Sequence, residues 1–250
     1  EDLREDAGSG LPMGLGIAGK QGWSHLGLYS EGDTWFREDE IYAFFDQLID
    51  DAFFGRFERV LLYGAVSHVY AAAVFSVAAP GARVLLIHPQ ATLDPRVTEW
   101  DQRFPEMRRV DFTSRYGYDP YEAEDAMHAA LFTRDGILKL RTPLMGSDLV
   151  PDFVNMGILT ALINAAVRGK LTAKMFARHY RIRRRYPVYL KRVLLHLERQ
   201  DRPFLTALYT RDVLRRMQGP RFRQTQSDAM KVLQQRGQRL PPALNQRNRQ

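Results

Sequence analysis

Residues 59–78, RVLLYGAVSHVYAAAVFSVA, carry the pattern that decides the fold of this chain. The run at residues 59–63 is short, apolar and continuous, which is typical of a strand buried inside a sheet. A turn that begins with Gly64 follows, and apolar residues then recur at helical spacing: Val69, Ala73 and Val77. This order predicts a buried strand, a tight turn and a helix that packs closely against the sheet.

The turn at residues 64–69 stands where enzymes of the α/β-hydrolase class place a serine nucleophile, in the motif G-x-S-x-G. Here the turn reads GAVSHV, so that Val66 occupies the nucleophile position and His68 the closing position, where a small residue belongs. Ser67 is the only serine at the turn, and it either acts as the nucleophile or caps the following helix. The frame of a catalytic site is therefore predicted, while Val66 and His68 favour a catalytically degenerate one.

A serine nucleophile needs a base and an acid, and in this class the acid precedes the histidine along the chain. Asp119 is the best acid by position, because it follows an expected strand and directly precedes a proline. His128 is the only histidine between Asp119 and the basic half, and its alternative role is that of a packed or surface residue in a helix. His68 is the other candidate base, although successive side chains at a helix start point about 100° apart, which turns it away from Ser67.

His88 follows a second apolar run, and the carboxyl ends of strands in open α/β sheets line the ligand crevice. His68 and His88 are therefore expected near one another at one edge of the sheet, where a histidine pair can move a proton or bind a metal. Two imidazoles without a third ligand of known position are a weak metal signal. We expect no metal and no cofactor.

Strands and helices are expected to alternate from about residue 24 to residue 141. The expected strands cover residues 24–30, 59–63, 83–87, 107–112 and 137–141. The expected helices cover residues 32–51, 67–78, 97–104 and 123–132. Such alternation predicts an α/β domain over residues 1–150, with a parallel sheet that the turn at residues 64–69 makes α/β-hydrolase-like.

From residue 151 onward, apolar residues recur only at helical spacing, which predicts an all-helical basic region over residues 151–236. Gly169 closes a first helix, and Thr172 caps a second helix that runs to about residue 185. Proline at the first helical position marks the start of the next two helices, at Pro187 and Pro203. A weaker helix is expected over residues 226–235.

Charge is divided unevenly along the chain. Residues 1–166 carry 14 Lys and Arg against 25 Asp and Glu, whereas residues 167–250 carry 22 against 4. The net charges are therefore −11 and +18, and this asymmetry predicts two surfaces with different partners. The last residues, 237–250, are polar and basic, and a disordered tail is expected there.

The basic region gathers its cations around three tyrosines, Tyr180, Tyr186 and Tyr189. Guanidinium groups interleaved with aromatic rings suit phosphates and stacked bases, and they also suit an anionic membrane surface. We expect an anionic partner: an acidic protein, a nucleic acid or an anionic lipid surface, with the chain's own acidic half or a merely solvated helix face as alternatives. The residues expected to bind it are Arg178, Arg181, Arg184, Arg185, Lys191, Arg192, Arg215 and Arg216.

The chain contains no cysteine, which excludes disulfides, thiol catalysis and cysteine-bound metal clusters, and suits a reducing compartment. No apolar run approaches the roughly 20 residues of a membrane span, and the acidic start EDLREDAGSG lacks the features of a signal peptide. We therefore expect a cytoplasmic protein without a transmembrane segment. Because the sequence does not begin with methionine, we also expect it to be a piece of a longer chain.

Several blocks of the sequence resemble a family of alphaproteobacterial proteins of the Rhodobacter and Roseobacter type. The blocks are GWSHLGLYSEGDTWFR (22–37), RVLLYGAVSHVYAAAVFSVAAPGARVL (59–85), PQATLDPRVTEWDQRF (89–104), FTSRYGYDP (112–120) and DAMHAALF (125–132). The resemblance implies an α/β-hydrolase fold followed by helices, in members that are mostly uncharacterised. Some members are labelled phosphoadenosine phosphosulfate reductase, but such reductases rely on a cysteine, which this chain lacks.

The chain also departs from what the resemblance implies. The family's turn is richer in small residues than the segment that holds Val66, His68 and Val69. Its members have a further strand between the positions of Tyr118 and Asp119, and the resemblance implies a first strand upstream of residue 1.

Two functional hypotheses follow. The first is a binding or assembly component, a catalytically degenerate α/β-hydrolase-like protein whose basic helices dock an anionic partner. The second is a serine ester or thioester hydrolase, or an acyltransferase, with Ser67 as nucleophile, Asp119 as acid and His128 or His68 as base. The departures at the turn favour the first hypothesis over the second.

Overall fold

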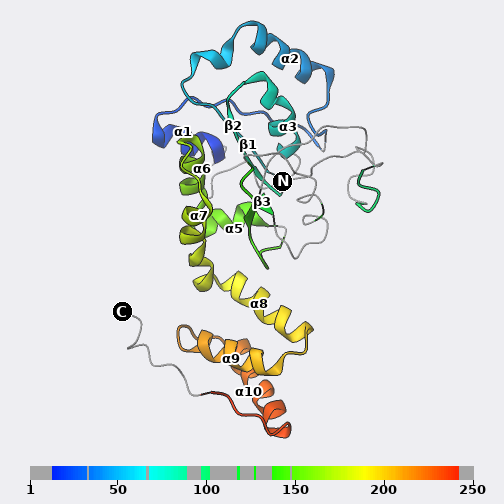
Figure 1. Cartoon of the computed structure of the whole chain (residues 1–250), viewed down its shortest axis with the longest axis vertical. Helices are drawn as coiled ribbons and strands as arrows, with labels where there is room; N and C mark the ends of the chain where they lie inside the picture. The colour runs from blue at the N-terminus through cyan, green and yellow to red at the C-terminus, as the bar shows by residue number, and fades with distance from the viewer. Residues whose placement is uncertain are drawn as a thin grey trace. The chain divides into compact units, whose positions relative to one another are not determined.

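The computed structural model describes residues 13–32, 34–65, 68–88, 97–101, 117–118, 127, 137–146 and 148–241. The chain divides into two compact units, Glu1–Ile182 and Arg183–Gln250, called here the N-terminal unit and the C-terminal unit (Figure 1). Each unit is described by itself.

The N-terminal unit is built around a small parallel sheet. Its strands lie in the order β1 (Leu61–Ala65), β2 (Arg83–Ile87), β3 (Gly117–Tyr118) and β4 (Leu140–Arg141), and every neighbouring pair is parallel. The β2 strand has the predicted bounds, whereas β1 begins at Leu61 rather than at residue 59. The predicted mixed α/β class with a parallel sheet is therefore confirmed, but within the described residues only β1 and β2 are longer than two residues.

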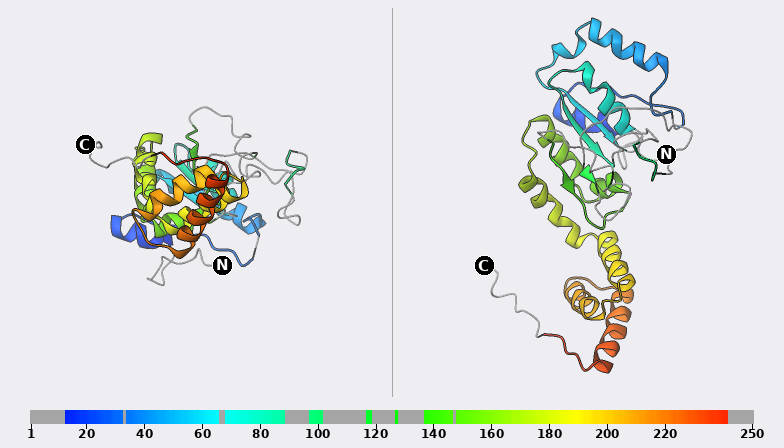
Figure 2. Two further views of the ribbon diagram at one scale, coloured as in Figure 1. Left: turned by 90° about the horizontal axis from the view of Figure 1, so that it is seen from below. Right: turned by 45° about the vertical axis from the view of Figure 1, so that its right-hand side comes forward.

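Helices cover both faces of this sheet, as Figure 2 shows. The helix α3 (His68–Val74) and the 3₁₀ turn η3 (Phe75–Ala78) follow β1, and α3 packs with Val84 and Leu86 of β2. Arg83 alternates with these two residues and donates a hydrogen bond of 3.0 Å to the carbonyl of Val167, at the end of α6 (Leu159–Val167). Because side chains alternate across a strand, α3 and α6 lie on opposite faces.

Gly64 explains why the helix after β1 packs so closely. A Cβ atom at Gly64 would lie 2.8 Å from the Cα of Val69 and still closer to the carbonyl of His68, both of them backbone atoms of α3. Any side chain at this position would push α3 off the sheet. The prediction of a helix packed closely on the strand is confirmed.

A layer of aromatic side chains joins α2 (Asp39–Asp50) to α3 and η3. Phe45 of α2 stacks on Phe75 with ring centroids 4.0 Å apart, and Phe36 packs into the same buried cluster. The prediction that this helix starts near residue 32 is wrong, because Trp35 and Phe36 are buried with φ near +57°, in the left-handed region that no helix adopts. The shorter elements α1 (Met13–Gln21) and η2 (Phe53–Arg56) flank this segment.

Three other expected elements differ from the structure. Residues 24–30 form no strand: Leu28 packs against the aromatic cluster, but Leu26 and Tyr29 are exposed, and no pairing with another described strand is formed. Residues 97–101 form turns rather than the start of a helix. Of the strand expected over residues 137–141, only β4 is formed. The strand expected at 107–112 lies outside the described residues, as does all of the helix expected at 123–132 except Met127, which is helical.

Helices alone follow β4, from α5 (Leu149–Asn155) through α6 to α7 (Ala173–Tyr180). The predicted caps are confirmed, because the Thr172 hydroxyl accepts a hydrogen bond from the Met175 amide and Gly169 follows α6 with a φ of +65°. These helices belong to the N-terminal unit, so the compact units divide after Ile182 although the helical region starts near the predicted residue 150.

Within the described residues no single helix has the length and apolar character needed to cross a membrane. By length and composition alone, α5 and α6 pass that test as a pair, but the chain bends by 102° between them.

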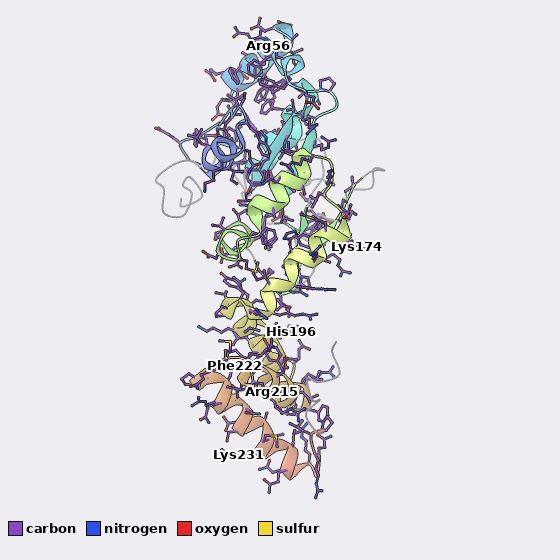
Figure 3. The ribbon with its side chains drawn as sticks, turned by 90° about the vertical axis from the view of Figure 1, so that its left-hand side faces the viewer. Arg56, Lys174, His196, Arg215, Phe222 and Lys231 are labelled. Carbon is purple, nitrogen blue, oxygen red and sulfur yellow. The ribbon has the colours of Figure 1, made fainter. Side chains whose placement is uncertain are left out.

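As far as residue 241, the C-terminal unit is a bundle of three α-helices, α8 (Pro187–Arg199), α9 (Pro203–Leu214) and α10 (Pro220–Gln235). Each begins with proline at its first turn, as predicted for the first two, and α10 starts well before the predicted residue 226. The bundle closes over two small apolar clusters: Leu190, Leu194, Val213 and Phe222, and Ala207, Ala229 and Leu233. Figure 3 labels Phe222 in this core and Arg215 and Lys231, which are exposed.

The first residues of the expected disordered tail lie against this bundle. Leu240 packs on the cluster that contains Ala207 and Leu233, and Arg211 donates a hydrogen bond of 2.6 Å to the carbonyl of Pro241. The rest of that expected tail, residues 242–250, lies outside the described residues.

Candidate functional site

Of the four predicted catalytic residues, the structure describes His68 alone. Ser67, Asp119 and His128 lie outside the described residues, so their roles stay predictions. His68 is described: it is the first residue of α3, and its ring packs on Phe36 with centroids 5.0 Å apart. This contact gives His68 a packing role beside an aromatic side chain.

Strand order also bears on this edge. In open α/β sheets the binding crevice forms where the strand order reverses. The order β1-β2-β3-β4 runs in one direction through the described sheet, so these four strands contain no reversal. Among the described residues, then, the topology provides no crevice of the usual kind.

His88 is a strained residue at the end of β2. Its φ is +59°, and its Nε2 atom lies 3.1 Å from the carbonyl of Gly146, in the loop that follows β4. The imidazole therefore links the segments after two strands. Its expected pairing with His68 stays a prediction, and no group of three or more metal-binding side chains occurs in the described part of the chain.

The C-terminal unit carries a large excess of positive charge. Residues 183–250 contain 15 Arg and 2 Lys against four carboxylates, a net charge of +13. Each carboxylate already has a cation: Arg221 lies 3.0 Å from Glu198, Arg216 2.6 Å from Asp212, Lys231 3.2 Å from Asp228 and Arg236 3.9 Å from Asp201. Hydrogen bonds from Gln224 and Lys231 also hold the pKa of Asp228 below its usual value.

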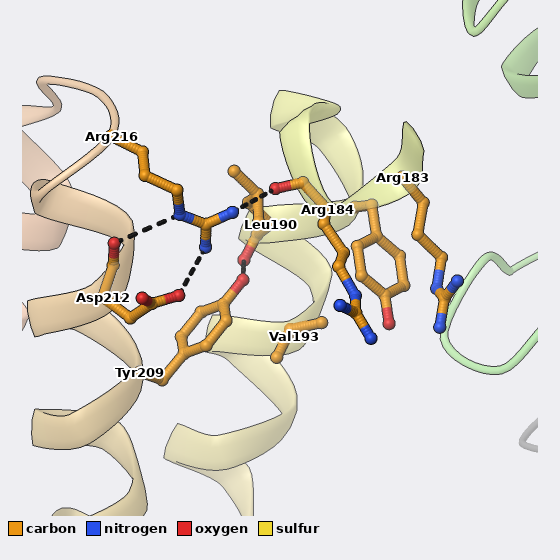
Figure 4. A pocket seen from close by; sticks show the side chains of 8 residues that line it. Arg183, Arg184, Leu190, Val193, Tyr209, Asp212 and Arg216 are labelled. Carbon is orange, nitrogen blue, oxygen red and sulfur yellow. Dashed lines mark hydrogen bonds and ion pairs between the residues drawn. The ribbon is translucent and has the colours of Figure 1, made fainter. Parts of the chain in front are cut away.

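A half-open cavity of about 530 Å³ lies within this unit, between the 3₁₀ turn η5 (Arg181–Arg185), α8 and α9 (Figure 4). The eight residues that line it are Arg183, Arg184, Tyr189, Leu190, Val193, Tyr209, Asp212 and Arg216. Three cations against one carboxylate give the lining a net charge of +2. We call this cavity the arginine pocket.

Arg216 is held by the protein at three of its nitrogen atoms. Nη2 donates to the Asp212 carboxylate at 2.6 Å, Nε to the Asp212 carbonyl at 3.3 Å, and Nη1 to the Arg184 carbonyl at 3.0 Å (Figure 4). The last bond ties the residues that directly follow α9 to η5 across the pocket. Arg216, predicted as an anion ligand, thus has a structural role in addition.

Tyr209 forms a second tie between α9 and α8. Its hydroxyl donates a hydrogen bond of 3.0 Å to the Leu190 carbonyl. Burial, assisted by the nearby Tyr189, raises the pKa of Tyr209 above its ordinary value, so the phenol remains a proton donor at neutral pH.

The other two arginines of the pocket differ from Arg216. The guanidinium of Arg183 lies over the ring of Tyr189, 5.5 Å from its centroid, in a cation–π contact. Arg184 is exposed, and its side chain makes no hydrogen bond or ion pair with the described residues. Arg184 therefore presents an open guanidinium at the rim of the cavity.

The structure brings together only two of the eight predicted anion-binding residues, Arg184 and Arg216, at the pocket. Arg178 and Arg181 are exposed on the N-terminal unit, and the exposed Arg185 and Lys191 belong to the C-terminal unit without lining the cavity. The other two, Arg192 and Arg215, also lie on the C-terminal unit outside the lining.

Sequence reasoning missed Tyr209 and Asp212, which complete the arginine pocket. Asp212 and Tyr209 precede Arg216 by four and seven residues, a spacing that places all three on one side of α9 and its C-terminal end, and this was the available signal. Comparisons with known proteins give no relative: no protein-family model, no curated protein and no solved structure matches the chain.

Proposed function

We propose that the protein is a binding or assembly component whose C-terminal unit docks an anionic partner. The observation that carries this proposal is the charge of that unit. Its four carboxylates are each paired with one cation, yet 17 cations are present. A surplus of this size attracts polyanions over several ångströms and accelerates their association.

The open side chains are grouped near one end of the bundle. Arg184 and Arg185 belong to η5 and Lys191 to the first turns of α8; all three are exposed and make no side-chain bond with the described residues. Unpaired cations on a folded helical surface can contact a phosphate or carboxylate without first breaking an internal ion pair.

The same proposal treats the N-terminal unit as a catalytically degenerate relative of the α/β hydrolases, in line with the resemblance to the alphaproteobacterial family. Val66 at the nucleophile position supports it, as does the packing of His68 on Phe36. A fluorophosphonate probe for activated serines should therefore leave the protein unlabelled. Labelling that disappears in Ser67→Ala would contradict the degenerate assignment.

The docking role is tested by measuring the affinity of the full chain for inorganic polyphosphate at several salt concentrations. The logarithm of the binding constant should fall steeply with the logarithm of salt, because binding releases condensed counterions. The triple variant Arg184→Gln, Arg185→Gln, Lys191→Gln should bind about tenfold or more weakly.

The control is a second triple variant with the same charge change, Arg199→Gln, Arg202→Gln, Arg239→Gln, whose positions are exposed on the same unit. It should weaken binding less than the first triple. A flat salt response of the unmodified chain would mean that its positive charge is already neutralised internally, and would contradict the docking role.

A further inference from the structure

The arginine pocket combines two kinds of recognition in one hollow. Its guanidinium groups suit a phosphate, and its two tyrosines offer flat apolar surfaces. The volume of about 530 Å³ falls in the range of small-ligand sites. A ligand that uses the whole pocket therefore needs a negative group and a planar ring a short distance apart.

Some residues of the pocket hold its walls together, and others are available to bind a ligand. Arg216 and Tyr209 hold α9 against η5 and α8 through the Arg184 and Leu190 carbonyls. The backbone of Arg184 is fixed in this way, while its guanidinium is open. An anion at the rim of the pocket therefore meets a hydrogen-bond donor whose backbone is already held in place. Anchoring of this kind lowers the ordering cost of binding.

Tyr189 supplies the ring. It is half-buried, lines the cavity, and its hydroxyl has no hydrogen bond with the described residues. The cation of Arg183 lies over one face of the ring, so a base is expected to stack on the other face, with a positive charge close by. Aromatic rings next to arginine are what proteins use to stack bases of single strands without sequence preference.

We propose that the arginine pocket receives one nucleotide of a single-stranded nucleic acid, with its phosphate at Arg184 and its base against Tyr189. This inference rests on the proposed docking function and names the partner. A lipid surface or an acidic peptide satisfies the cations but brings no planar ring to the hollow. Neighbouring exposed cations, Arg185 and Lys191, then follow the backbone of the strand.

The test compares two ligands that share phosphates but differ in rings: a ten-nucleotide oligo-dT and inorganic polyphosphate of equal length. In the full chain, Tyr189→Leu should weaken oligo-dT binding about 5- to 150-fold, the range measured for loss of one stacked base. Polyphosphate affinity should stay unchanged. Tyr189→Phe keeps the ring and should bind oligo-dT like the unmodified chain, and circular dichroism of both variants checks that the helices remain.

A matched pair of charge variants examines the phosphate position. Arg184→Gln and Arg199→Gln each remove one positive charge from an exposed site of the same unit, but only Arg184 lines the pocket. We expect Arg184→Gln to weaken oligo-dT binding at least threefold more than Arg199→Gln. Equal losses would overturn the assignment of a phosphate to Arg184.

The outcomes separate this inference from the function on which it rests. If the chain binds polyphosphate and oligo-dT alike and Tyr189→Leu changes neither, the pocket assignment fails while the docking function stands. If Tyr189→Leu weakens binding to phosphatidylserine vesicles as strongly as to oligo-dT, the partner is a membrane and the nucleic acid assignment fails. If the unmodified chain binds none of the three, both proposals fail.

Discussion

The carboxyl edge of the sheet, where the sequence predicts a catalytic site, and the arginine pocket, which only the structure reveals, are built in opposite ways. At the sheet edge the two described histidines make contacts within the protein: His68 packs on Phe36, and His88 forms a hydrogen bond with the Gly146 carbonyl. At the pocket, Arg216 is similarly occupied, but Arg184 beside it is open. The difference teaches that a surface suited to binding needs a polar side chain without an internal partner, such as Arg184, on a backbone that the fold holds in place.

The two regions also differ in backbone strain. Trp35, Phe36 and His88 of the N-terminal unit have positive φ values, which cost a non-glycine residue free energy. The three helices of the C-terminal unit start with proline, whose fixed φ suits a helix start, and the only non-glycine residue with positive φ among residues 183–241 is Asp201. Tight packing holds the N-terminal unit in its conformation, and local helix signals define the other.

The largest expected effect tests the tight packing. Gly64→Ala places a methyl group against the backbone of His68 and Val69, which cannot turn aside as a side chain would. We expect a loss of about 2–3 kcal/mol in the free energy of unfolding of the N-terminal unit, measured by urea denaturation.

The control is Gly19→Ala, in the exposed part of α1, where an added Cβ meets nothing within 4 Å. Alanine there should stabilise by about 0.5–1 kcal/mol, because it favours the helix. If Gly64→Ala were as harmless as Gly19→Ala, the close approach of α3 to β1 would not be what requires glycine.

A smaller effect, of opposite sign in the two units, is expected from removing one tyrosine hydroxyl. The hydroxyl of Tyr63 on β1 is buried without a partner among the described residues, so Tyr63→Phe should stabilise the fold by about 1 kcal/mol. Tyr209→Phe removes the hydrogen bond to the Leu190 carbonyl and should destabilise by about 1 kcal/mol. Thermal unfolding of both variants, which differ from the native chain by one oxygen atom, checks the signs.

The same two tyrosines make the stability of the protein depend on pH in the alkaline range. Burial raises the pKa of both Tyr63 and Tyr209 above the ordinary value of about 10. The free energy of unfolding is therefore unaffected by these groups below about pH 10 and falls as the pH rises further, because the unfolded phenols ionise first. Each Phe variant should therefore show a weaker decline in stability between about pH 10 and 11 than the native chain. An unchanged decline in both would contradict the burial of these hydroxyls.

The smallest effect distinguishes Arg184 from Arg216, two of the three arginines that line the pocket. Arg216→Gln loses the bonds to Asp212 and to the Arg184 carbonyl and should cost about 0.5–1 kcal/mol of stability in the C-terminal unit. Arg184→Gln should leave stability unchanged and reduce oligo-dT affinity. Urea denaturation and fluorescence anisotropy on the same two variants measure both quantities, and a reversed pattern would exchange the assigned roles.

Local sequence signals predicted the elements that depend on few neighbours. The run at residues 83–87, the cap at Thr172 and the helix starts at Pro187 and Pro203 needed only a short window of sequence. The left-handed turn at Trp35 and Phe36 was not predicted, because burial in the aromatic layer overrides the helical pattern of the sequence at this point.

The candidate site shows the same division. The cluster of cations was visible in the sequence, but the pocket was not, because Arg216 meets the Arg184 carbonyl from 32 residues away in the chain. No periodicity in the sequence shows which arginine side chain will donate to a backbone carbonyl and which will remain without an internal partner. That distinction arises only when η5, α8 and α9 pack together.

One consequence concerns regulation. Of the 17 cations in residues 183–250, 15 are arginine, whose charge persists across every pH a cell reaches. Acetylation, the common way to erase positive charge from a nucleic-acid-binding surface, acts on lysine and can reach only Lys191 and Lys231 here. Acetylation can therefore remove at most two of the 17 positive charges of the proposed docking surface, so salt and competing polyanions are the stronger means of releasing the proposed partner.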